Sequence, residues 1–451
     1  MILRTFLLII FFCSIIIIVP FVKNYASSSN PDSLIIAPGQ SVKIDSIKII
    51  GNEGTKDFII LRELTFKPGD SITGKQLQYN KERVVSLGIF SFVELYVIKS
   101  DDKNVAIIEV HESWYIYPIP IVRFRDHDVT KANYGISLLY KNFRGRNETL
   151  RSIISLGYDP SYSIEYSIPA LFYEQGIGLY INSSYSTILN RSDIAKSLAG
   201  GDFNYKSFSN NITVEKRINQ FNDLLFTAGF TYLESDVFGL GRITASGQRI
   251  DRVPYAGITY FYDTRDLKQY SLTGLYIALS LFQDGLGFDD INYSVVNLDF
   301  REYEKIADDL SGRWRFAFRN TFGGSIPYYD YSTLGYGNNV RGHSTDYREG
   351  NNSILTSFEL IYPIIKEWDV SFKLPLLPER LTSARLGFYL TSFIDYGGIY
   401  NNTDKFSLNG FYAGYGFGLT MLAIPYNAVR FEYAFGDNGR GEFLFGIGFS
   451  F

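Results

Sequence analysis

The feature that most constrains this chain is a two-residue alternation of apolar and polar side chains that runs through residues 114–451. It recurs between clusters of Gly, Asn, Asp and Ser, a pattern typical of consecutive β-strands joined by turns. In one stretch Trp314 and Phe316 share one face, whereas Arg313 and Arg315 share the other. The same separation is present in residues 274–282, 294–302 and 428–436. Large apolar side chains therefore gather on one face of each predicted strand and charged ones on the other.

Two architectures use strands of this kind, a soluble antiparallel sandwich and a transmembrane β-barrel. Many predicted strands have about nine or more residues, the length that a tilted strand needs to cross a bilayer. The charged face is also rich in arginine, which a sandwich does not require. We therefore predict a mainly β protein whose 16-stranded antiparallel transmembrane β-barrel occupies residues 113–451. The 338 residues from position 114 onward allow roughly 21 residues for each strand with its loop.

Composition argues against an enzyme. The chain has 35 Tyr and 37 Phe but only 1 Cys and 3 His, which disfavours a disulfide scaffold, a zinc site and a thiol enzyme. The three histidines, His111, His127 and His343, are far apart, and neither a P-loop nor a Gly-x-Ser-x-Gly motif is present. We predict no catalytic residue, no metal and no cofactor. A net charge of -4 does not suit a nucleic-acid partner.

The N-terminus has the pattern of a secretory signal peptide. Arg4 precedes an apolar run that ends near Val19, and a small polar segment follows at Ala26. The alternative is a permanent anchor helix, because the apolar run is long enough to cross a membrane. We predict a signal peptide over residues 1–26 and a linker over residues 27–41. Cys13 lies in the signal peptide, so the exported chain would contain no cysteine.

Residues 42–112 have a mixed pattern that predicts a small α+β domain in the order β-α-α-β-β. Strand-like segments cover residues 42–52, 89–98 and 105–112, and helix-like segments cover residues 55–64 and 73–88. Thr73 and Gln76 have the spacing of a capping box, which would begin the second helix.

This segment resembles a POTRA domain, the polypeptide-transport-associated module in the periplasmic arms of outer-membrane assembly and secretion proteins. The positions that carry the resemblance are Ile47, Ile49, Gly51 and Asn52 in the first strand, Lys67, Gly69 and Asp70 in a turn, Leu87, Gly88, Ile89 and Phe90 before the second strand, and Val110 and Glu112 in the last. One copy is present in the sequence.

The predicted barrel resembles that of the BamA and TamA family of outer-membrane assembly factors, which belong to the bacterial surface antigen group. The matching positions are Asn142, Gly145 and Asn147 near its start, Asp263 to Asp266 with Gly274 in the middle, and Val340, Arg341, Gly342 and His343 farther on. In that family the last motif is the tip of a loop that folds back into the lumen. His343 replaces the usual Phe or Tyr of the motif.

An arginine inside a lumen needs carboxylate partners, because an unpaired buried charge is costly. Glu359 alternates with apolar neighbours so that it should point inward, and so does Asp395. Asp395 and Gly397 also resemble the family's Phe-x-Asp-x-Gly strand motif. We therefore predict that Arg341 pairs with Asp395 or Glu359 and holds the loop inside the barrel. The alternative is an ordinary solvated loop arginine.

The last residues resemble the terminal-strand signal that bacterial barrel assembly machinery recognises. Gly446, Phe449 and Phe451 match that signal, whereas Leu444 stands where a polar residue is usual. Together with the signal peptide, this resemblance implies a protein of the bacterial outer membrane whose POTRA domain lies in the periplasm.

The family resemblance implies insertion of outer-membrane proteins or translocation of polypeptides. Its partners would be unfolded outer-membrane or secreted polypeptides bound by the POTRA domain, membrane lipids, and accessory periplasmic or lipoprotein subunits. The first strand, expected near residues 133–140, and the last, residues 442–451, would form a seam that opens laterally. The alternatives are a passive channel or surface antigen and a two-partner secretion pore.

Overall fold

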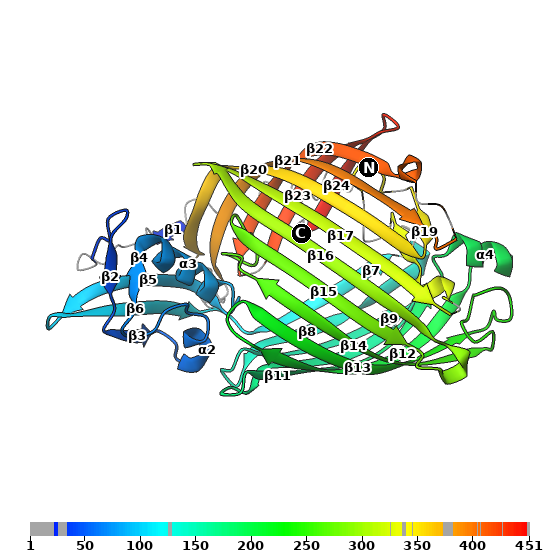
Figure 1. Ribbon diagram of the computed structural model, residues 1–451, viewed down its shortest axis with the longest axis horizontal. Helices are drawn as coiled ribbons and strands as arrows, with labels where there is room; N and C mark the ends of the chain where they lie inside the picture. Colours follow the sequence, from blue (N-terminus) through cyan, green and yellow to red (C-terminus); the bar gives the residue numbers. More distant parts are fainter. Residues whose placement is uncertain are drawn as a thin grey trace.

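The computed structural model describes residues 34–448, apart from residues 125–128, 325, 336–339, 345, 373–381, 404, 406 and 426, and it also describes residues 22–25. Most of the chain forms one antiparallel sheet that curves into a barrel, with a small domain at one end (Figure 1). This confirms the predicted mainly β fold and its sixteen barrel strands. These strands are β7 (Ile116–Phe124), β8 (Ala132–Phe143), β9 (Glu148–Gly157), β10 (Ser161–Phe172), β11 (Ile177–Leu189), β12 (Asn204–Arg217), β13 (Asn222–Ser235), β14 (Ile250–Asp263), β15 (Gly274–Asp284), β16 (Tyr293–Ala307), β17 (Leu310–Gly323), β20 (Asn352–Phe372), β21 (Ser383–Tyr400), β22 (Tyr412–Ile424), β23 (Asn427–Gly436) and β24 (Gly441–Ile447).

Each barrel strand pairs with the next one along the chain, from β7 with β8 to β23 with β24. β24 then stands beside β7 in the strand order, so these two strands form the seam. Our assignment of the first strand to residues 133–140 was wrong, because those residues lie in β8, which pairs with both β7 and β9. The true first strand contains Pro118 and Pro120, and proline is disfavoured in strands except at sheet edges.

As predicted, the barrel strands place large apolar side chains on the outer face and charged side chains on the inner face. On β15, Leu279 and Leu281 are about half exposed on the outer surface. On β17, Trp314 is exposed, whereas Arg313 is 2% exposed in the interior. Outward-facing apolar residues of this kind cover the barrel wall, as a lipid-facing surface requires.

The small N-terminal domain has a three-stranded sheet in the order β3 (Ser46–Ile50), β6 (Lys103–Glu112), β5 (Phe90–Ser100). A short pair, β2 (Ser41–Lys43) and β4 (Ser71–Thr73), and two helices, α2 (Asp57–Leu61) and α3 (Gly74–Val85), complete it. The side chain of Thr73 accepts a hydrogen bond from the Gln76 backbone, and the Gln76 side chain accepts one from the Thr73 backbone. The predicted capping box is therefore present and begins α3.

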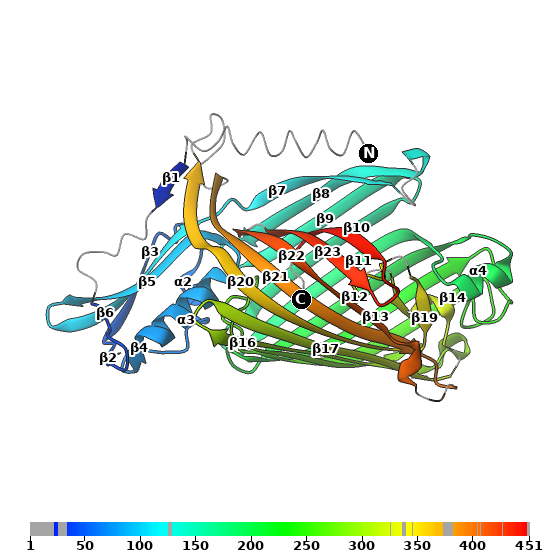
Figure 2. The ribbon, with the colours of Figure 1, turned by 90° about the horizontal axis from the view of Figure 1, so that it is seen from above.

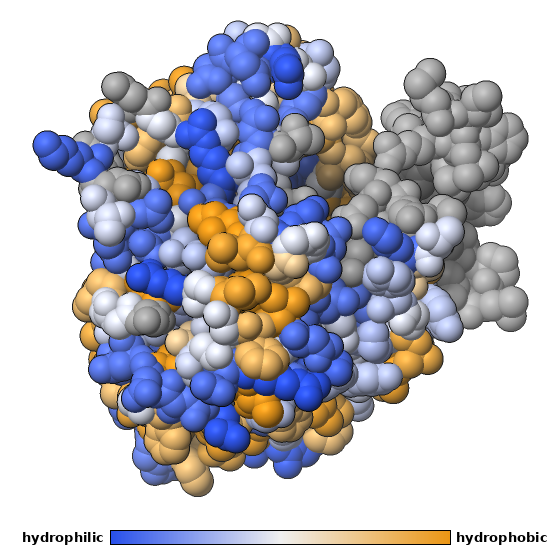
Figure 3. Space-filling model, turned by 90° about the vertical axis from the view of Figure 1, so that its right-hand side faces the viewer, coloured by the Kyte–Doolittle hydropathy of each residue, from blue (hydrophilic) through white to orange (hydrophobic). Residues whose placement is uncertain are grey.

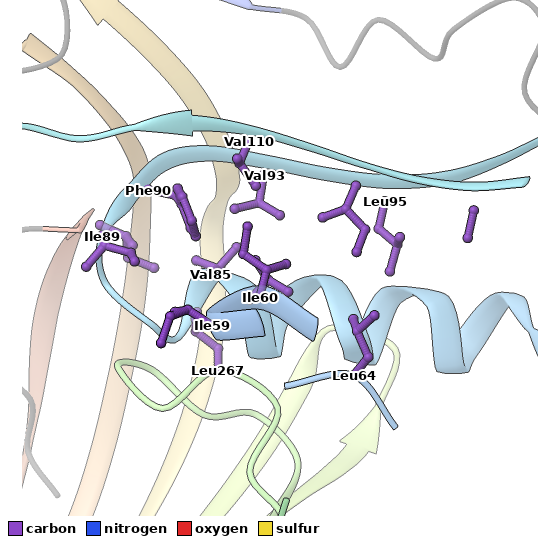
Figure 4. Close-up of a cluster of buried hydrophobic side chains, with 14 of the residues drawn as sticks. Ile59, Ile60, Leu64, Val85, Ile89, Phe90, Val93, Leu95, Val110 and Leu267 are labelled. Carbon is purple, nitrogen blue, oxygen red and sulfur yellow. The ribbon is translucent and has the colours of Figure 1, made fainter. Parts of the chain in front are cut away.

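The N-terminal domain and the barrel share one hydrophobic cluster. Ile59, Val85 and Phe90 of the domain pack around Leu267, which lies in the turn between β14 and β15 (Figure 4). All four side chains are at most 3% exposed. This end of the barrel, where the turns after the even-numbered strands β8, β10, β12 and β14 lie, is called the domain end below.

The opposite end of the barrel carries the longer loops and α4 (Asp193–Ala199). Its surface is mainly hydrophilic, with a few apolar patches (Figure 3). A short hairpin, β18 (Ser332–Leu334) with β19 (Arg348–Gly350), lies there at the base of the loop that contains Arg341. Short 3-10 turns complete the elements at Val129–Lys131, Phe288–Asp290, Tyr328–Asp330 and Leu408–Gly410.

One further strand comes from the predicted signal peptide. β1 (Val22–Tyr25) pairs antiparallel with residues 369–372 at the end of β20 (Figure 2). The rest of the predicted signal peptide and residues 27–33 of the predicted linker lie outside the described residues. No described helix has the length and apolar character needed to cross a membrane.

Candidate functional site

The tip of the loop between β18 and β19 lies inside the barrel. Val340 is 1% exposed and His343 is 3% exposed, although both belong to a loop. Gly342 has φ of +96°, and a Cβ there would lie 2.6 Å from the Phe435 carbonyl carbon of β23. A left-handed backbone in so close a contact requires glycine. The tip is thus fitted closely against the inner wall.

Arg341 is bound by three carboxylates. Its Nε and Nη2 donate to Oδ2 and Oδ1 of Asp395, each at 2.7 Å, in a bidentate pair. Its Nη1 donates to Glu359 at 2.7 Å and to Glu432 at 2.9 Å. The guanidinium also lies over the Phe393 ring, 3.6 Å from its centroid. The structure therefore brings Arg341 together with both of the partners that the sequence suggested.

Strand alternation explains how the three carboxylates converge. Glu359, Asp395 and Glu432 lie on β20, β21 and β23, and each occupies a position whose side chain faces inward. They are 1%, 1% and 6% exposed. Glu432 was not among the predicted partners. Its signal was available, because it alternates with the outward Phe431 and Tyr433, but the sequence does not show that β23 approaches the loop tip.

Two glycines of the wall make room for the tip. A Cβ at Gly414 of β22 would lie 1.7 Å from the Arg341 carbonyl oxygen, closer than any real contact. A Cβ at Gly397 of β21 would lie 3.1 Å from a methyl group of Val340. Gly397, which the sequence linked to Asp395, is therefore a packing position for the loop, and Gly414 is a further one.

His343 occupies the position where the resemblance led us to expect Phe or Tyr. Its ring stacks on Tyr412 with centroids 4.3 Å apart and planes 14° apart. Nδ1 lies 2.7 Å from an Asp346 carboxylate oxygen, and Nε2 lies 3.0 Å from an Asp437 carboxylate oxygen. The imidazole thus retains the stacking of an aromatic ring and adds polar contacts.

The last strand also contacts the tip. A carboxylate oxygen of Glu442 in β24 accepts the Gly342 N–H at 2.7 Å, and the same carboxylate accepts the Ser344 hydroxyl. Through Arg341 and Gly342 the tip is therefore bonded to β20, β21, β23 and the seam strand β24. We call the residues Val340, Arg341, Gly342, His343, Glu359, Asp395, Glu432 and Glu442 the loop-tip site.

The ion pairs and hydrogen bonds of the loop-tip site fix the loop tip to the barrel wall. Three carboxylates accept hydrogen bonds from all three guanidinium nitrogens of Arg341, and removal of one buried partner of such an ion pair typically costs about 3–5 kcal/mol. Among the described residues, no group of three or more His, Cys, Asp or Glu side chains has a geometry suited to a metal ion.

A second cluster of charges joins the N-terminal domain to the barrel. Glu63, which is 6% exposed, receives Arg83 of α3 at 2.8 Å and Arg217 of β12 at 2.7 Å. Arg83 also donates to the carbonyl of Gln220 in the following turn at 2.8 Å. Burial opposes ionisation of Glu63, but the guanidiniums of Arg217 and Arg83 hold its pKa at about 2, below the ordinary 4.5. Glu63 is therefore an ionised bridge between the two parts.

The other motif residues have distinct places. Asn142, near the end of β8, donates to the Thr55 hydroxyl of the N-terminal domain at 2.8 Å, so that motif lies at the domain end. Gly446 lies in β24 opposite Arg430, and a Cβ there would be 3.0 Å from the guanidinium. Phe449 and Phe451 of the predicted terminal signal lie outside the described residues. Phe443 and Phe445 of the same strand are about 60% exposed on the outer face.

Comparison with known proteins gives two family matches. A model described as the Omp85 superfamily domain matches residues 142–451, which is more than half of the chain. A POTRA model, described as the surface antigen variable number repeat, matches residues 42–113.

Solved structures with the same fold include BamA from Haemophilus ducreyi lacking POTRA domains 1–3, with a TM-score of 0.53 and 17% identity over 94% of this chain and 88% of that one. CdiB from Escherichia coli has a TM-score of 0.49 and 11% identity over 94% of this chain and 92% of that one. Among curated proteins, a 3-dehydroquinate dehydratase from Saccharolobus solfataricus is 26% identical over 157 residues. That match covers 31% of this chain and 65% of the dehydratase, less than two thirds of its length, and it does not show a family.

Proposed function

Because this chain belongs to the Omp85 superfamily, we propose that it inserts barrel precursors into the outer membrane and guides their strands as they enter the bilayer. The protein has an Omp85-type outer-membrane β-barrel with one POTRA domain. The observation that carries the proposal is the loop-tip site, where Arg341 and Gly342 tie four barrel strands, including the seam strand β24, to one loop. In the proposed mechanism the protein acts without enzymatic chemistry.

The POTRA domain, which we place in the periplasm, would receive the client. Extended polypeptides bind to sheet edges by β-augmentation. One edge strand of the POTRA sheet, β5, already accepts a hydrogen bond at the Val97 carbonyl from the Leu34 N–H, at 2.7 Å. At the other edge, no strand in the described part of the chain pairs with the outer side of β3. We therefore assign client binding to β3. The partners are unfolded outer-membrane or secreted polypeptides.

The seam between β7 and β24 would then open to let client strands into the membrane. Pro118 and Pro120 in β7 are residues that sheets accept at edges, and Gly446 in β24 offers no side chain to pack across the seam. Glu442 holds β24 to the Gly342 N–H, so release of the loop tip would free one side of the seam. Membrane lipids and accessory periplasmic or lipoprotein subunits complete the proposed set of partners.

Depletion of the protein tests this function. We expect the folded levels of several other outer-membrane barrels to fall together, as measured by quantitative proteomics of isolated outer membranes. Loss of a single exported protein from the medium, with normal barrels, would instead favour a two-partner secretion pore. Unchanged levels of both would favour a passive channel or surface antigen.

A further inference from the structure

The Asp-Thr-Arg-Asp motif, which takes no part in the loop-tip site, begins at Asp263, the last residue of β14, and continues into the turn between β14 and β15, residues 264–273. This turn does not extend into solvent. Leu267, Tyr270 and Ser271 are 3–4% exposed, because one side of the turn packs on the POTRA domain and the other lies in the barrel mouth. Figure 4 shows the turn beneath the POTRA helices. We call residues 264–273 the wedge turn.

The POTRA domain holds the wedge turn through α3 and the residue after it. The Tyr79 hydroxyl donates to the Thr264 carbonyl at 3.1 Å. Ser86 accepts the Lys268 N–H on its hydroxyl at 3.0 Å, and its carbonyl accepts the Gln269 side chain at 3.2 Å. Three hydrogen bonds and the buried Leu267 thus fix the turn to the domain.

The wedge turn is internally rigid. Asp266 accepts the N–H groups of Leu267 and Leu272 at 2.8 and 3.1 Å, and the Ser271 hydroxyl donates to the Leu267 carbonyl at 2.8 Å. Gly274, at φ of +111°, lets the two strands approach, because a Cβ there would lie 2.5 Å from the Thr264 carbonyl oxygen. A displacement of one side of such a turn is therefore passed to its other side.

Arg313 of β17 joins the wedge turn to the loop-tip site. Its Nε donates to the Ser271 carbonyl at 3.2 Å, and its guanidinium lies 4.0 Å from the centroid of the Tyr270 ring. Its Nη1 lies 3.7 Å from Oε2 of Glu359. The other oxygen of Glu359, Oε1, accepts Arg341. Glu359 is thus shared by two arginines, one from each side.

We propose that Arg313 is a positioning residue. Through the wedge turn and Glu359, it couples the docking of the POTRA domain to the position of Arg341 among its carboxylate partners. Movement of the POTRA domain, as on binding a client, shifts the wedge turn, draws Arg313 away from Glu359 and weakens the hold on the loop tip. Glu359, Arg313 and Tyr270 are all at most 4% exposed, so the contacts lie where water does not screen them.

The coupling is tested by hydrogen exchange on the full chain in lipid, followed at the wedge turn and at residues 340–344. Arg313→Gln should raise exchange at both segments by about tenfold, the size expected when neighbouring groups couple by roughly 1.4 kcal/mol. The matched control is Arg315→Gln, two positions along β17, because Arg315 pairs with Asp299 rather than Glu359. Faster exchange at the loop tip in both variants would overturn the proposal.

A milder variant, Tyr79→Phe, removes one hydroxyl from the POTRA domain and leaves the lumen intact. We expect it to raise exchange at residues 340–344 in the wild-type background and to have no further effect there when combined with Arg313→Gln. Arg313→Lys keeps the charge but cannot reach Ser271, Tyr270 and Glu359 in one plane, so it should not restore coupling. An unchanged loop tip in Tyr79→Phe, or restoration by lysine, would contradict the role assigned to Arg313. These readouts do not depend on insertase activity.

Discussion

Arg341 and Asp395 are 54 positions apart in sequence and form two parallel N–H···O bonds of 2.7 Å in the barrel lumen. Such a planar pair fixes orientation as well as distance, which a lysine at position 341 could not reproduce. The third guanidinium nitrogen, Nη1, donates to Glu359 of β20 and Glu432 of β23. Arg341 therefore holds the loop tip against the barrel wall close to the seam. The loop tip is therefore fixed inside this outer-membrane barrel by the ion pairs of Arg341.

Arg341→Ala should unseat the loop without unfolding the barrel. The variant removes the guanidinium that three buried carboxylates share, a loss of roughly 3–5 kcal/mol at the site, while the strand registers do not involve the side chain. We expect a new protease cut near residue 341 and a normal heat-modifiable band of the folded barrel. Arg301→Ala is the control, because Arg301 pairs with Asp299 of its own strand.

Gly414→Ala offers an independent way to unseat the tip. Its added methyl group would collide with the Arg341 carbonyl, whereas Gly201→Ala meets nothing within 4 Å. The protease cut near residue 341 should appear in Gly414→Ala and should be absent from Gly201→Ala. An uncut Gly414→Ala barrel would contradict the close packing of the tip.

The sequence was sufficient for the parts that depend on local periodicity. Alternation placed Trp314 outside and Arg313 inside, and the Thr73–Gln76 spacing marked the start of α3. The pairing of Arg341 with Asp395 could be anticipated because a buried charge requires a counter-charge and few inward carboxylates were available nearby. These inferences use rules that act over a few residues or a single charge balance.

The sequence was insufficient where distant segments meet. Glu432 faces inward by its own alternation, but only the closed arrangement of strands brings it 2.9 Å from Arg341. The burial of Leu267 depends on how the POTRA domain docks, and a turn rich in polar residues gives no local sign of it. The first strand was misplaced because Pro118 and Pro120 argue against a strand unless its edge position is known.

Acid should loosen the POTRA domain from the barrel. Because the pKa of Glu63 is about 2 rather than 4.5, its stabilising effect is complete above about pH 4.5 and is lost as pH falls toward 2. A shift of that size corresponds to roughly 3 kcal/mol. Protease release of the POTRA domain, measured against pH, should show a transition in this window.

Glu63→Gln should remove that transition and loosen the domain at neutral pH. Glu94→Gln is the matched control, since Glu94 pairs with Lys81 inside the POTRA domain. A Glu63→Gln protein that keeps the wild-type acid transition would show that another group links the two parts.

Charged substitutions on the outer surface of the barrel should destabilise the folded protein in lipid. Leu279, in the middle of β15 and 48% exposed, should tolerate arginine poorly, with a loss of about 2–4 kcal/mol in lipid folding equilibria if its depth is near the bilayer centre. The neighbouring Ser280 faces the lumen and bonds to Asn297 at 3.2 Å, so Ser280→Arg should cost much less. Equal losses at the two positions would argue against a lipid-facing wall.

Export should remove the only cysteine. If the signal peptide ends at residue 26, the mature protein begins near Ser27 and lacks Cys13. Intact mass and maleimide labelling of protein purified from outer membranes should show the shortened chain without a thiol. A labelled, full-length chain would instead indicate a retained anchor.

Insertion of an unfolded barrel precursor into liposomes is the most direct measure of the central claim. Liposomes that contain the purified protein should fold the precursor faster than empty liposomes, as followed by heat-modifiable mobility and protease protection. Liposomes with Arg341→Ala, in which the ion pairs of Arg341 are lost but the barrel is folded, should lose most of that acceleration. Equal folding rates with the wild-type protein, the variant and no protein would contradict the account.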